Sequence, residues 1–406
     1  MEKLLYLDTA RIGRITPGAQ RAFIDYLSLV GQEGGSSYFE RFLRHGLADC
    51  PAWMKDAYPS LNCWNGIASL KQSLRTLAGS RPELPVLLSL RTSQLMKLAA
   101  RLMLRNCLNV LTTDLGWPSY YITLEAERVR SNATTTTVPV KNAVLERGGT
   151  EDEVVETICR AYADKRCDGL FLSAVSNLGV RLPIARIVRR LESAHEVRFV
   201  VVDGAQDFCH LTPDIHEEYC DFYLAGCHKW FQAYHPMGLG FYGKRRSVGF
   251  IETTLSGMIA NGDIDDPLLR YTREVESGRV NGYSETVNFG PLFSCQGAIA
   301  DRGTSDEQVT QQEHQRQNLE VVAGIVTDAN WRPVLLDSGL RTGILLAQAN
   351  DPDLSRKDPS AMREAFREHG VGLSAYEGGI IRLSMPQVLL ARDEAATLKN
   401  AFDLVA

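Results

Sequence analysis

Apolar and polar positions alternate in a regular helix–strand rhythm through the middle of the chain. Thr150 followed by Glu153 forms a capping-box pattern, and apolar residues at helical spacing behind it predict a helix over 151–164. The short apolar run at 170–175 predicts a buried strand. Pro183 then opens a second helical stripe through Leu191, and the run 199–202 predicts another buried strand that ends at Asp203. This order is a βαβ unit, in which ligands bind at the carboxyl ends of the strands, so Asp203 and Asn177 are expected at one crevice.

More strands flank this unit. The pattern predicts strands over 85–90, 108–112, 134–138 and 221–225, and an antiparallel-looking partner over 238–242. A long helical pattern follows the first of these, through Leu95 and Leu102. Past about residue 250 the pattern changes: glycine and polar residues run from 256 to 283, with 261–266 typical of an exposed loop, before helical segments resume near 297. We therefore expect a second domain in this part of the chain.

Length and composition favour a globular protein with two unequal domains. The chain has 406 residues, more than the roughly 250–300 at which a single core stops growing. Apolar residues make up 44% and charged residues 23%, so a sizeable core is expected. The net charge of −5 comes from scattered charges, which argues against nucleic acid or an anionic membrane as partner.

Cysteine spacing and the N-terminus suggest a reducing compartment. Nine cysteines occur without a Cys-x-x-Cys pair, and the histidines are not at zinc-ligand spacing from them, so no metal site is expected. An acid at Asp8 comes too soon for a signal-peptide core, and no apolar run approaches the roughly 18 residues of a membrane span. We expect a cytoplasmic location.

Lys229 and Asp203 are the candidate catalytic pair. Each follows a predicted strand, and they lie 26 residues apart (229 − 203). An aldehyde cofactor needs a lysine to form an imine and a carboxylate to keep its pyridine nitrogen protonated, because the protonated ring accepts the electron pair left at the substrate α-carbon. Either residue alone would be an ordinary solvated charge or a turn residue. The combination favours pyridoxal-phosphate chemistry.

Four short motifs carry a resemblance to the aminotransferase class V family of pyridoxal-phosphate (PLP) enzymes. The nearest branch includes cysteine desulfurases, selenocysteine lyases, isopenicillin N epimerases and kynureninases. The resemblance is strong over about 170–245 and weaker but collinear elsewhere. The motifs are Ser173-Ala174-Val175-Ser176-Asn177, Val202-Asp203-Gly204-Ala205-Gln206, His228-Lys229 and Pro236-Met237-Gly238-Leu239-Gly240.

The resemblance implies an α/β fold, the PLP-dependent transferase fold type I. Its large domain holds a mostly parallel seven-stranded sheet flanked by helices, and its smaller C-terminal domain is α+β. We place an N-terminal segment joining the small domain at 1–15, the PLP-binding large domain at 16–285 and the small domain at 286–406.

The resemblance also implies roles for residues around the cofactor. Lys229 is the Schiff-base lysine, Asp203 the partner of the ring nitrogen and Gln206 the donor to the ring's phenolic oxygen. Asn177 contacts that oxygen or the substrate carboxylate, and His228 resembles the phosphate-contacting histidine. For His228, a packed histidine beside a strand is the plain alternative.

Three further sites are implied by residues whose positions match those of functional residues in the family. Thr92 and Ser93 begin a predicted helix and match the family's phosphate cup, although an ordinary helix cap looks the same. Trp117 stands where the family stacks an aromatic on the ring, with a core residue as the alternative. Arg382 resembles the arginine that binds the substrate α-carboxylate, with a buried structural salt bridge as the alternative. The loops at 11–13 and 119–121 are expected to line the substrate pocket, but their residues do not indicate which side chain the substrate carries.

The sequence departs from the family at several positions. Cysteine desulfurases carry a flexible-loop cysteine well downstream of the lysine, whereas the last cysteine here is Cys295, expected to be an apolar filler. Gly226 replaces a serine that binds the phosphate, Cys227 replaces a glycine, and Ala174 replaces a histidine. Persulfide transfer is therefore doubtful, while chemistry at the α-carbon survives because Lys229 can move the proton.

We favour an enzyme that transforms an amino acid through an external aldimine, as a C–S or C–C lyase without a persulfide cysteine. An aminotransferase or an amino-acid epimerase on the same scaffold is the alternative, and a noncatalytic scaffold is a remote one. The resemblance further implies a homodimer, with residues 286–290 as candidates for reaching the other subunit's phosphate.

Overall fold

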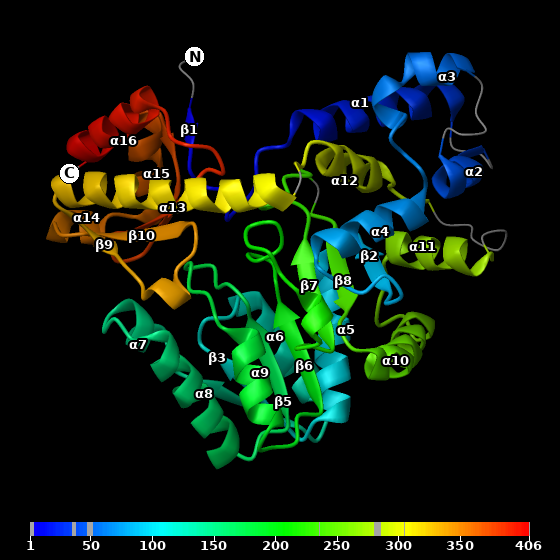
Figure 1. Cartoon of the computed structure of the whole chain (residues 1–406), viewed down its shortest axis with the longest axis horizontal. Helices are drawn as coiled ribbons and strands as arrows, with labels where there is room; N and C mark the ends of the chain where they lie inside the picture. Colours follow the sequence, from blue (N-terminus) through cyan, green and yellow to red (C-terminus); the bar gives the residue numbers. More distant parts are fainter. Residues whose placement is uncertain are drawn as a thin grey trace.

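A seven-stranded sheet organises the larger part of the molecule (Figure 1). The computed structural model describes residues 4–34, 38–46, 52–234, 236–279, 286–303 and 305–405. The strand order is β2-β8-β7-β6-β5-β3-β4, and β8 runs antiparallel to the other six strands. This confirms the mostly parallel sheet predicted from the sequence. The strands are β2 (Val86–Ser89), β3 (Asn109–Thr113), β4 (Thr134–Val138), β5 (Gly169–Ser173), β6 (Phe199–Asp203), β7 (Phe222–Gly226) and β8 (Gly238–Tyr242).

Helices cover both faces of this sheet. Successive side chains of a strand point to opposite faces, so Val200 and Val202 of β6 enter one apolar core while Phe199 and Val201 enter the other. The first core includes α1 (Pro17–Glu33), α4 (Ile67–Leu77), α8 (Glu151–Asp164), α9 (Ile184–Glu192) and α12 (Gly290–Ala300). The second includes α5 (Thr92–Asn106), α6 (Pro118–Arg128) and α10 (Val248–Ala260). Three short helices complete this part: α2 (Tyr38–His45), α3 (Ala52–Ala57) and α7 (Lys141–Leu145).

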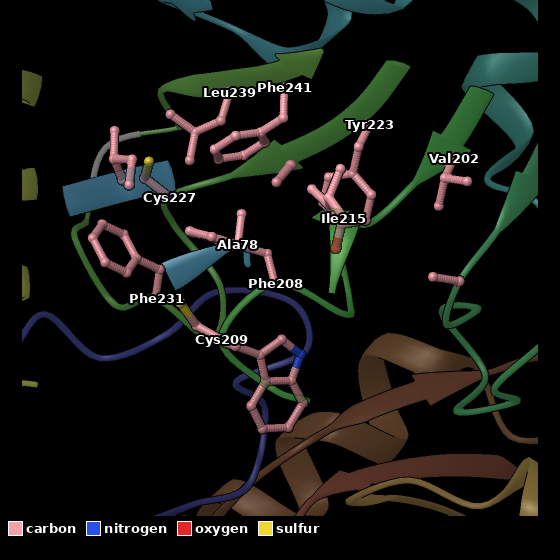
Figure 2. Packing of buried hydrophobic residues seen from close by; sticks show 14 of the residues in the cluster. Ala78, Val202, Phe208, Cys209, Ile215, Tyr223, Cys227, Phe231, Leu239 and Phe241 are labelled. Carbon is pink, nitrogen blue, oxygen red and sulfur yellow. The ribbon is translucent and has the colours of Figure 1, made fainter. Parts of the chain in front are cut away.

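Aromatic rings fill the first core close to the loop that carries Lys229. Figure 2 shows Phe208, Phe231 and Phe241 there, with ring centroids 5.6 and 5.8 Å from Phe208. Cys209 and Cys227 lie in the same cluster, and both are buried. Dense packing of this kind holds a loop in one conformation.

The predicted βαβ unit is confirmed in detail. Thr150 caps α8 in a complete capping box with Glu153, and β5 pairs in parallel with β6. Pro183 is the N-cap of α9 rather than its first residue. The buried residues of α9 are those of the apolar stripe, Ile184, Ile187, Val188 and Leu191.

The prediction for residues 256–283 was wrong over 256–279, and residues 280–283 lie outside the described residues. The structure has helices where we expected an irregular polar stretch: α10 runs to Ala260, and α11 (Pro267–Ser277) packs beside β2. Residues 261–266 do form the turn between them, but Asp266 is buried and accepts hydrogen bonds from the backbone N–H groups of Leu90 (2.9 Å) and Leu269 (2.9 Å). Glycines 249 and 257 obscured a pattern that tertiary packing stabilises.

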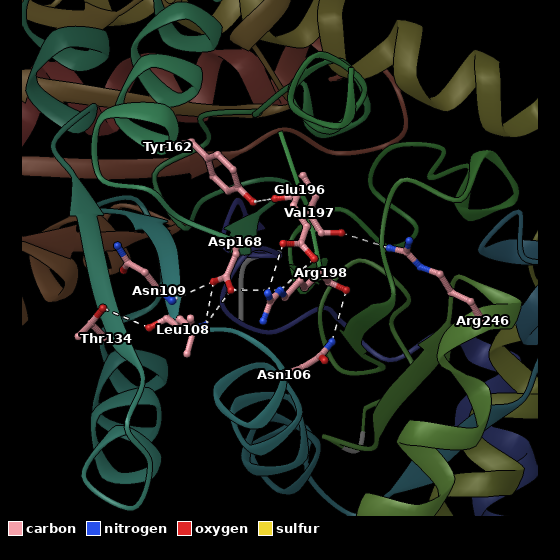
Figure 3. Close-up of polar contacts among 10 residues, drawn as sticks. All are labelled: Asn106, Leu108, Asn109, Thr134, Tyr162, Asp168, Glu196, Val197, Arg198 and Arg246. Carbon is pink, nitrogen blue, oxygen red and sulfur yellow. Dashed lines mark hydrogen bonds and ion pairs between the residues drawn. The ribbon is translucent and has the colours of Figure 1, made fainter. Parts of the chain in front are cut away.

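The amino ends of the strands carry a polar network that ties the sheet edge together. Figure 3 shows the Asp168 carboxylate accepting from the backbone N–H groups of Leu108 and Asn109, both at 2.9 Å, and lying 3.5 Å from Arg198 Nε. This edge is opposite to the carboxyl ends where the site lies.

The C-terminal part forms a smaller α+β unit, at the upper left of Figure 1. Its antiparallel sheet has the order β12-β13-β10-β9, and β1 from the N-terminal segment pairs with β11, so Leu5 and Leu7 enter the core of this unit. The prediction that residues 1–15 join the small domain agrees in place with this pairing. The expected boundary at residue 285 falls in 280–285, outside the described residues, and stays a prediction. The elements are β1 (Leu5–Tyr6), α13 (Ser305–Asp328), β9 (Trp331–Val334), β10 (Ile344–Ala349), α14 (Pro352–Arg356), α15 (Pro359–Glu368), β11 (Val371–Gly372), β12 (Ser374–Tyr376), β13 (Ile380–Ser384) and α16 (Arg392–Val405).

No helix in the described ranges is both long and apolar enough to cross a bilayer. The cellular location stays a prediction.

Candidate active site

A cavity of about 760 Å³ lies where the carboxyl ends of the central strands meet the small unit. Every predicted site residue contributes to its lining, although these residues come from segments that span most of the chain. The lining includes Thr92, Ser93, Trp117, Asn177, Asp203, Gln206, His228, Lys229 and Arg382. The structure thus brings the predicted set together at one place.

Lys229 and Asp203 face the same cavity from the ends of neighbouring strands. Burial lowers the pKa of Lys229 to about 8; the Asp203 carboxylate opposes this shift, and Arg382 adds to it. A lysine with a pKa near 8 has a substantial neutral fraction at neutral pH, which a nucleophilic amine requires. The geometry therefore suits Lys229 to attack an electrophilic carbon.

Asp203 is buried at the end of β6. Burial raises its pKa, while the backbone N–H of Ala205 (3.0 Å), the Lys229 charge and the Ser173 hydroxyl (3.3 Å) act in the opposite direction. A buried carboxylate with so few donors needs a cationic partner to stay ionised. A protonated nitrogen of a bound ring is such a partner.

His228, Gly226 and the start of α5 form a small polar hollow. The Nδ1 atom of His228 is buried without a hydrogen-bond partner. Burial and the adjacent Lys229 charge lower the His228 pKa to about 4, so its ring is neutral at physiological pH. A Cβ built on Gly226 would lie 3.2 Å from Thr92 Oγ1 and 3.3 Å from His228 Nδ1. No side chain caps α5, whose N-terminal N–H groups favour an anion in this hollow.

The Gln206 side chain is fixed by two hydrogen bonds. Its Nε2 donates to Ala10 O (2.6 Å), and its Oε1 accepts from Trp230 Nε1 (2.8 Å). One N–H of the amide remains for a ligand. The predicted role of Gln206 as a donor to a ring oxygen depends on that single hydrogen and stays a prediction.

Arg382 is held by the protein on three sides. Its Nη2 lies 3.0 Å from Asp8 Oδ1 and donates to Ser374 Oγ (3.1 Å), and its Nη1 donates to Asn177 O (3.0 Å). The Nε atom is buried without a partner. The structural salt bridge that was the plain alternative for Arg382 is therefore present. Binding a substrate carboxylate stays a prediction, supported by the partnerless Nε.

Two aromatic side chains line the cavity wall beside the predicted ring position. Trp117 is the N-cap of α6 and is 47% exposed, so the alternative that it is a core residue is wrong. Tyr120, one turn later, also lines the cavity, and burial together with Asp203 raises its pKa. We expected residues 119–121 to form a loop that lines the substrate pocket and gave Tyr120 no role of its own. The structure places them in α6 instead of a loop.

Sequence reasoning missed several charged residues of the site. Asp8 has no motif, because its partner Arg382 is distant in sequence. Arg91, which precedes Thr92, and Arg363 on α15 also line the cavity. The position of Arg91 directly before Thr92 could have indicated its place in the site. The sequence around Arg363 contains no comparable motif.

The cysteines of the described ranges lie outside the cavity lining. Cys295 is fully buried in α12, with its Sγ 4.0 Å from Cys227 Sγ. Burial raises the Cys295 pKa well above its usual value, and Cys227 adds to the shift, so Cys295 is a neutral thiol. This agrees with its prediction as an apolar filler.

Part of the chain that contains most of this site is similar to known proteins. Residues 91–270 match the family model Aminotransferase class-V. A cysteine desulfurase of Wigglesworthia glossinidia brevipalpis is 35% identical over 77 residues, which is 18% of this chain and 18% of that protein. An isopenicillin N epimerase of Amycolatopsis lactamdurans is 36% identical over 93 residues, 23% of this chain and 22% of that protein. These curated relatives are matched over about a fifth of their own length.

The overall fold has solved counterparts. The cystine C–S lyase C-DES, in complex with its reaction product cysteine persulfide, superposes with a TM-score of 0.72 at 16% identity, over 99% of this chain and 98% of that chain. Identity this low establishes the fold alone. Residues 91–270, which carry most of the site, match the aminotransferase class V model, and the chain as a whole has the fold type I architecture of PLP-dependent enzymes.

Proposed function

We propose that this chain is a PLP-dependent enzyme acting on an amino acid, and that it cleaves a C–S or C–C bond without a persulfide cysteine. The observation that carries the proposal is the pairing of Lys229, with its lowered pKa, and buried Asp203 at one cavity. The donor set fits the cofactor at its phosphate end and at its ring end.

The phosphate end fits the hollow at Gly226. His228 Nδ1 lacks a partner there, and the missing side chain at Gly226 leaves the space between Thr92 and His228 open. Thr92, Ser93, His228 and the adjacent Arg91 would hold the phosphate. Arg91 would supply hydrogen-bond donors to the phosphate in place of the hydroxyl that a serine at position 226 would give.

The ring end fits the buried carboxylate. Asp203 would pair with the ring nitrogen, Gln206 and Asn177 would lie near the ring oxygen, and Trp117 or Tyr120 would cover a ring face. When bound, the cofactor supplies an aldehyde that condenses with an amine and a protonated ring that accepts an electron pair. Asp203 stabilises the ring's charge because both groups lie out of bulk water.

Lys229 is the proton carrier of the proposed reaction. Its Nζ, neutral in part near pH 8, takes the proton from the substrate α-carbon and returns a proton to the product side. Arg382, oriented by Asp8 and Asn177, binds the α-carboxylate and fixes which α-bond faces Lys229.

The position of the cysteines favours direct release of the leaving group. Within the described ranges no thiol lines the cavity, and Cys295 is buried and neutral. A sulfur leaving group would therefore depart as a free product rather than as a protein persulfide. An epimerase or aminotransferase uses the same lysine and carboxylate, and the similarity to an isopenicillin N epimerase supports the former as a second candidate.

A homodimer is part of the proposal. Trp117 lines the cavity and is 47% exposed, so a second subunit could cover it. Residues 286–290 lead into α12. In a homodimer, these residues would reach the cavity of the other subunit. Sedimentation equilibrium would show a single species of twice the chain mass; a monomer with full activity would contradict this part.

The experiment that tests the function has two steps. Reduction of the purified protein with borohydride, followed by peptide mass spectrometry, should place a phosphopyridoxyl label on Lys229. The Lys229→Ala variant should fold and carry no label, while Lys141→Ala, which changes an exposed lysine of α7, should keep it. A yellow protein labelled elsewhere, or a colourless one, contradicts the proposal.

The second step identifies the reaction. The holoenzyme is mixed with a panel of amino acids, and the products are separated into cleaved side chain, inverted amino acid and keto acid. Cleavage supports the lyase. Predominant amino transfer to a keto acid, or inversion, would replace it with the corresponding alternative.

A further inference from the structure

From the charges that line the cavity, we infer that the substrate carries a second acidic group on its side chain, bound by Arg363 and Arg11. This inference rests on the proposed function, because it assigns the part of the cavity that the cofactor and the α-carboxylate leave open. The ligand class is an amino acid whose side chain ends in a carboxylate or a similar oxyanion.

The cavity contains more cations than the expected cofactor and α-carboxylate sites use. Four arginines line it, together with Lys229, and the only acid among the lining residues of the described chain is Asp203. Arg91 lies beside Thr92 at the phosphate end, and Arg382 lies at the proposed α-carboxylate position. Arg11 and Arg363 remain without a proposed anion.

Arg382 already has a counter-ion, unlike these two. Asp8 lies 3.0 Å from its Nη2, and both side chains are buried. The charge of Arg382 is thus balanced before a ligand arrives. An incoming anion is therefore attracted more strongly to arginines that lack such a partner.

Arg363 enters the cavity from the small unit. It lies on α15, which packs on β12, the strand that contributes Ser374 and Tyr376 to the lining. Among the described residues, its side chain forms one hydrogen bond, to Ser360 Oγ (2.8 Å), one turn earlier on the same helix. No carboxylate of the described residues lies within ion-pair distance of it.

Arg11 enters from the N-terminal segment. The preceding residue, Ala10, accepts a hydrogen bond from Gln206 Nε2 and so anchors this segment at the cavity floor. The Arg11 guanidinium is exposed and has no acidic partner in the described part of the chain. Arg11 and Arg363 therefore present cationic heads from opposite chain ends to one cavity.

The chemistry of the two side chains selects the ligand. A guanidinium is planar and presents paired N–H donors that match the two oxygens of a carboxylate or sulfinate. A neutral or apolar side chain would leave both guanidinium charges without a counter-ion. An acidic side chain would provide a counter-ion for both guanidinium groups.

Matched acid and amide ligands test this directly. L-glutamate and L-aspartate are titrated into the holoenzyme against L-glutamine and L-asparagine, and the dissociation constant is read from the change in cofactor absorbance. Charge-assisted hydrogen bonds should make at least one acid bind about tenfold more tightly than its amide. Added salt should weaken the acid more than the amide.

Variants assign the effect to the two arginines. Arg363→Met and Arg11→Met should each reduce the acid preference, and the double variant should abolish it, with no change in amide affinity. Arg367→Met, an exposed arginine of α15 outside the lining, is the matched control and should keep the preference.

The outcomes separate this inference from the proposed function. Equal affinities of acid and amide for a holoenzyme labelled at Lys229, or a preference that survives in the double variant, would overturn the second acidic group and leave the PLP function standing. Failure to label Lys229 would overturn the function itself.

Discussion

Asp8 and Arg382 lie 374 positions apart in the sequence, yet their side chains form a buried ion pair with Nη2 and Oδ1 3.0 Å apart. The pair joins the N-terminal segment to β13, and Ser374 Oγ donates to the same Asp8 oxygen (2.7 Å). An arginine so held has one orientation toward the cavity. Positioning of the substrate therefore depends on a residue that no site motif contains.

Replacement of Asp8 by Asn should destabilise the fold and weaken substrate binding. The change leaves a buried guanidinium without its counter-ion, which costs about 3 kcal/mol of unfolding free energy. Chemical denaturation measures the loss. In the double variant Asp8→Asn/Arg382→Met no charge is left unpaired, so its loss should be smaller than that of the single change; an equal or larger loss would contradict the pairing.

The lowered pKa of Lys229 predicts how its reactivity depends on pH. Burial lowers the Lys229 pKa to about 8, so the fraction of neutral amine increases as pH rises through that value. A short pulse of pyridoxal 5′-phosphate with cyanoborohydride, given to the apoprotein, should label Lys229 with a midpoint near pH 8. Asp203→Asn removes the charge that raises this pKa, so its midpoint should fall below 8. A midpoint at about 10.4, the value of a free lysine, would contradict the burial effect.

His210 should make the protein sensitive to mild acid. Its ring stacks on Trp230 at 3.7 Å, and its Nε2 accepts from Gly343 N–H (3.2 Å) while Nδ1 lies 2.8 Å from Gln206 O. Burial lowers its pKa to about 4, so the unfolded state binds the proton more tightly. Stability attributable to His210 should therefore be complete above about pH 6.5 and fall by roughly 3 kcal/mol as pH drops toward 4.

Comparison of two histidine variants checks this. In His210→Gln the loss of stability between pH 6.5 and 4 should be smaller than in the unmodified protein, whereas exposed His216→Gln should leave the pH profile unchanged. Parallel profiles for all three proteins would show that His210 does not titrate as described.

Gly238→Ala should displace the backbone at the start of α5. A Cβ at this position would lie 2.5 Å from the backbone N of Thr92 and 2.8 Å from the backbone C of Arg91, so the proposed phosphate site must shift. We expect weaker retention of cofactor on dialysis, by tenfold or about 1.4 kcal/mol, together with reduced stability. Gly257→Ala, in α10 with open space around it, should gain up to about 1 kcal/mol from helix propensity. Unchanged retention in Gly238→Ala would remove Thr92 from the site.

The chain pattern predicted the central sheet because each strand is a short apolar run and each helix carries an apolar stripe. It failed over α10 and α11, where glycines and polar residues weaken the periodicity and contacts with α5 and β2 stabilise the helices instead. Local propensity is a weak prior that such packing overrides.

The sequence by itself determined the βαβ order and hence the edge of the sheet at which Asp203 and Lys229 lie, because parallel strands place their carboxyl ends together. The tertiary structure alone decided which charges meet there. Arg11, Arg363 and Arg382 reach the cavity from the two ends of the chain, and the ion pair of Arg382 with Asp8 follows from packing of the N-terminal segment on the small unit. Ion pairs depend on distance in space, which sequence separation does not encode.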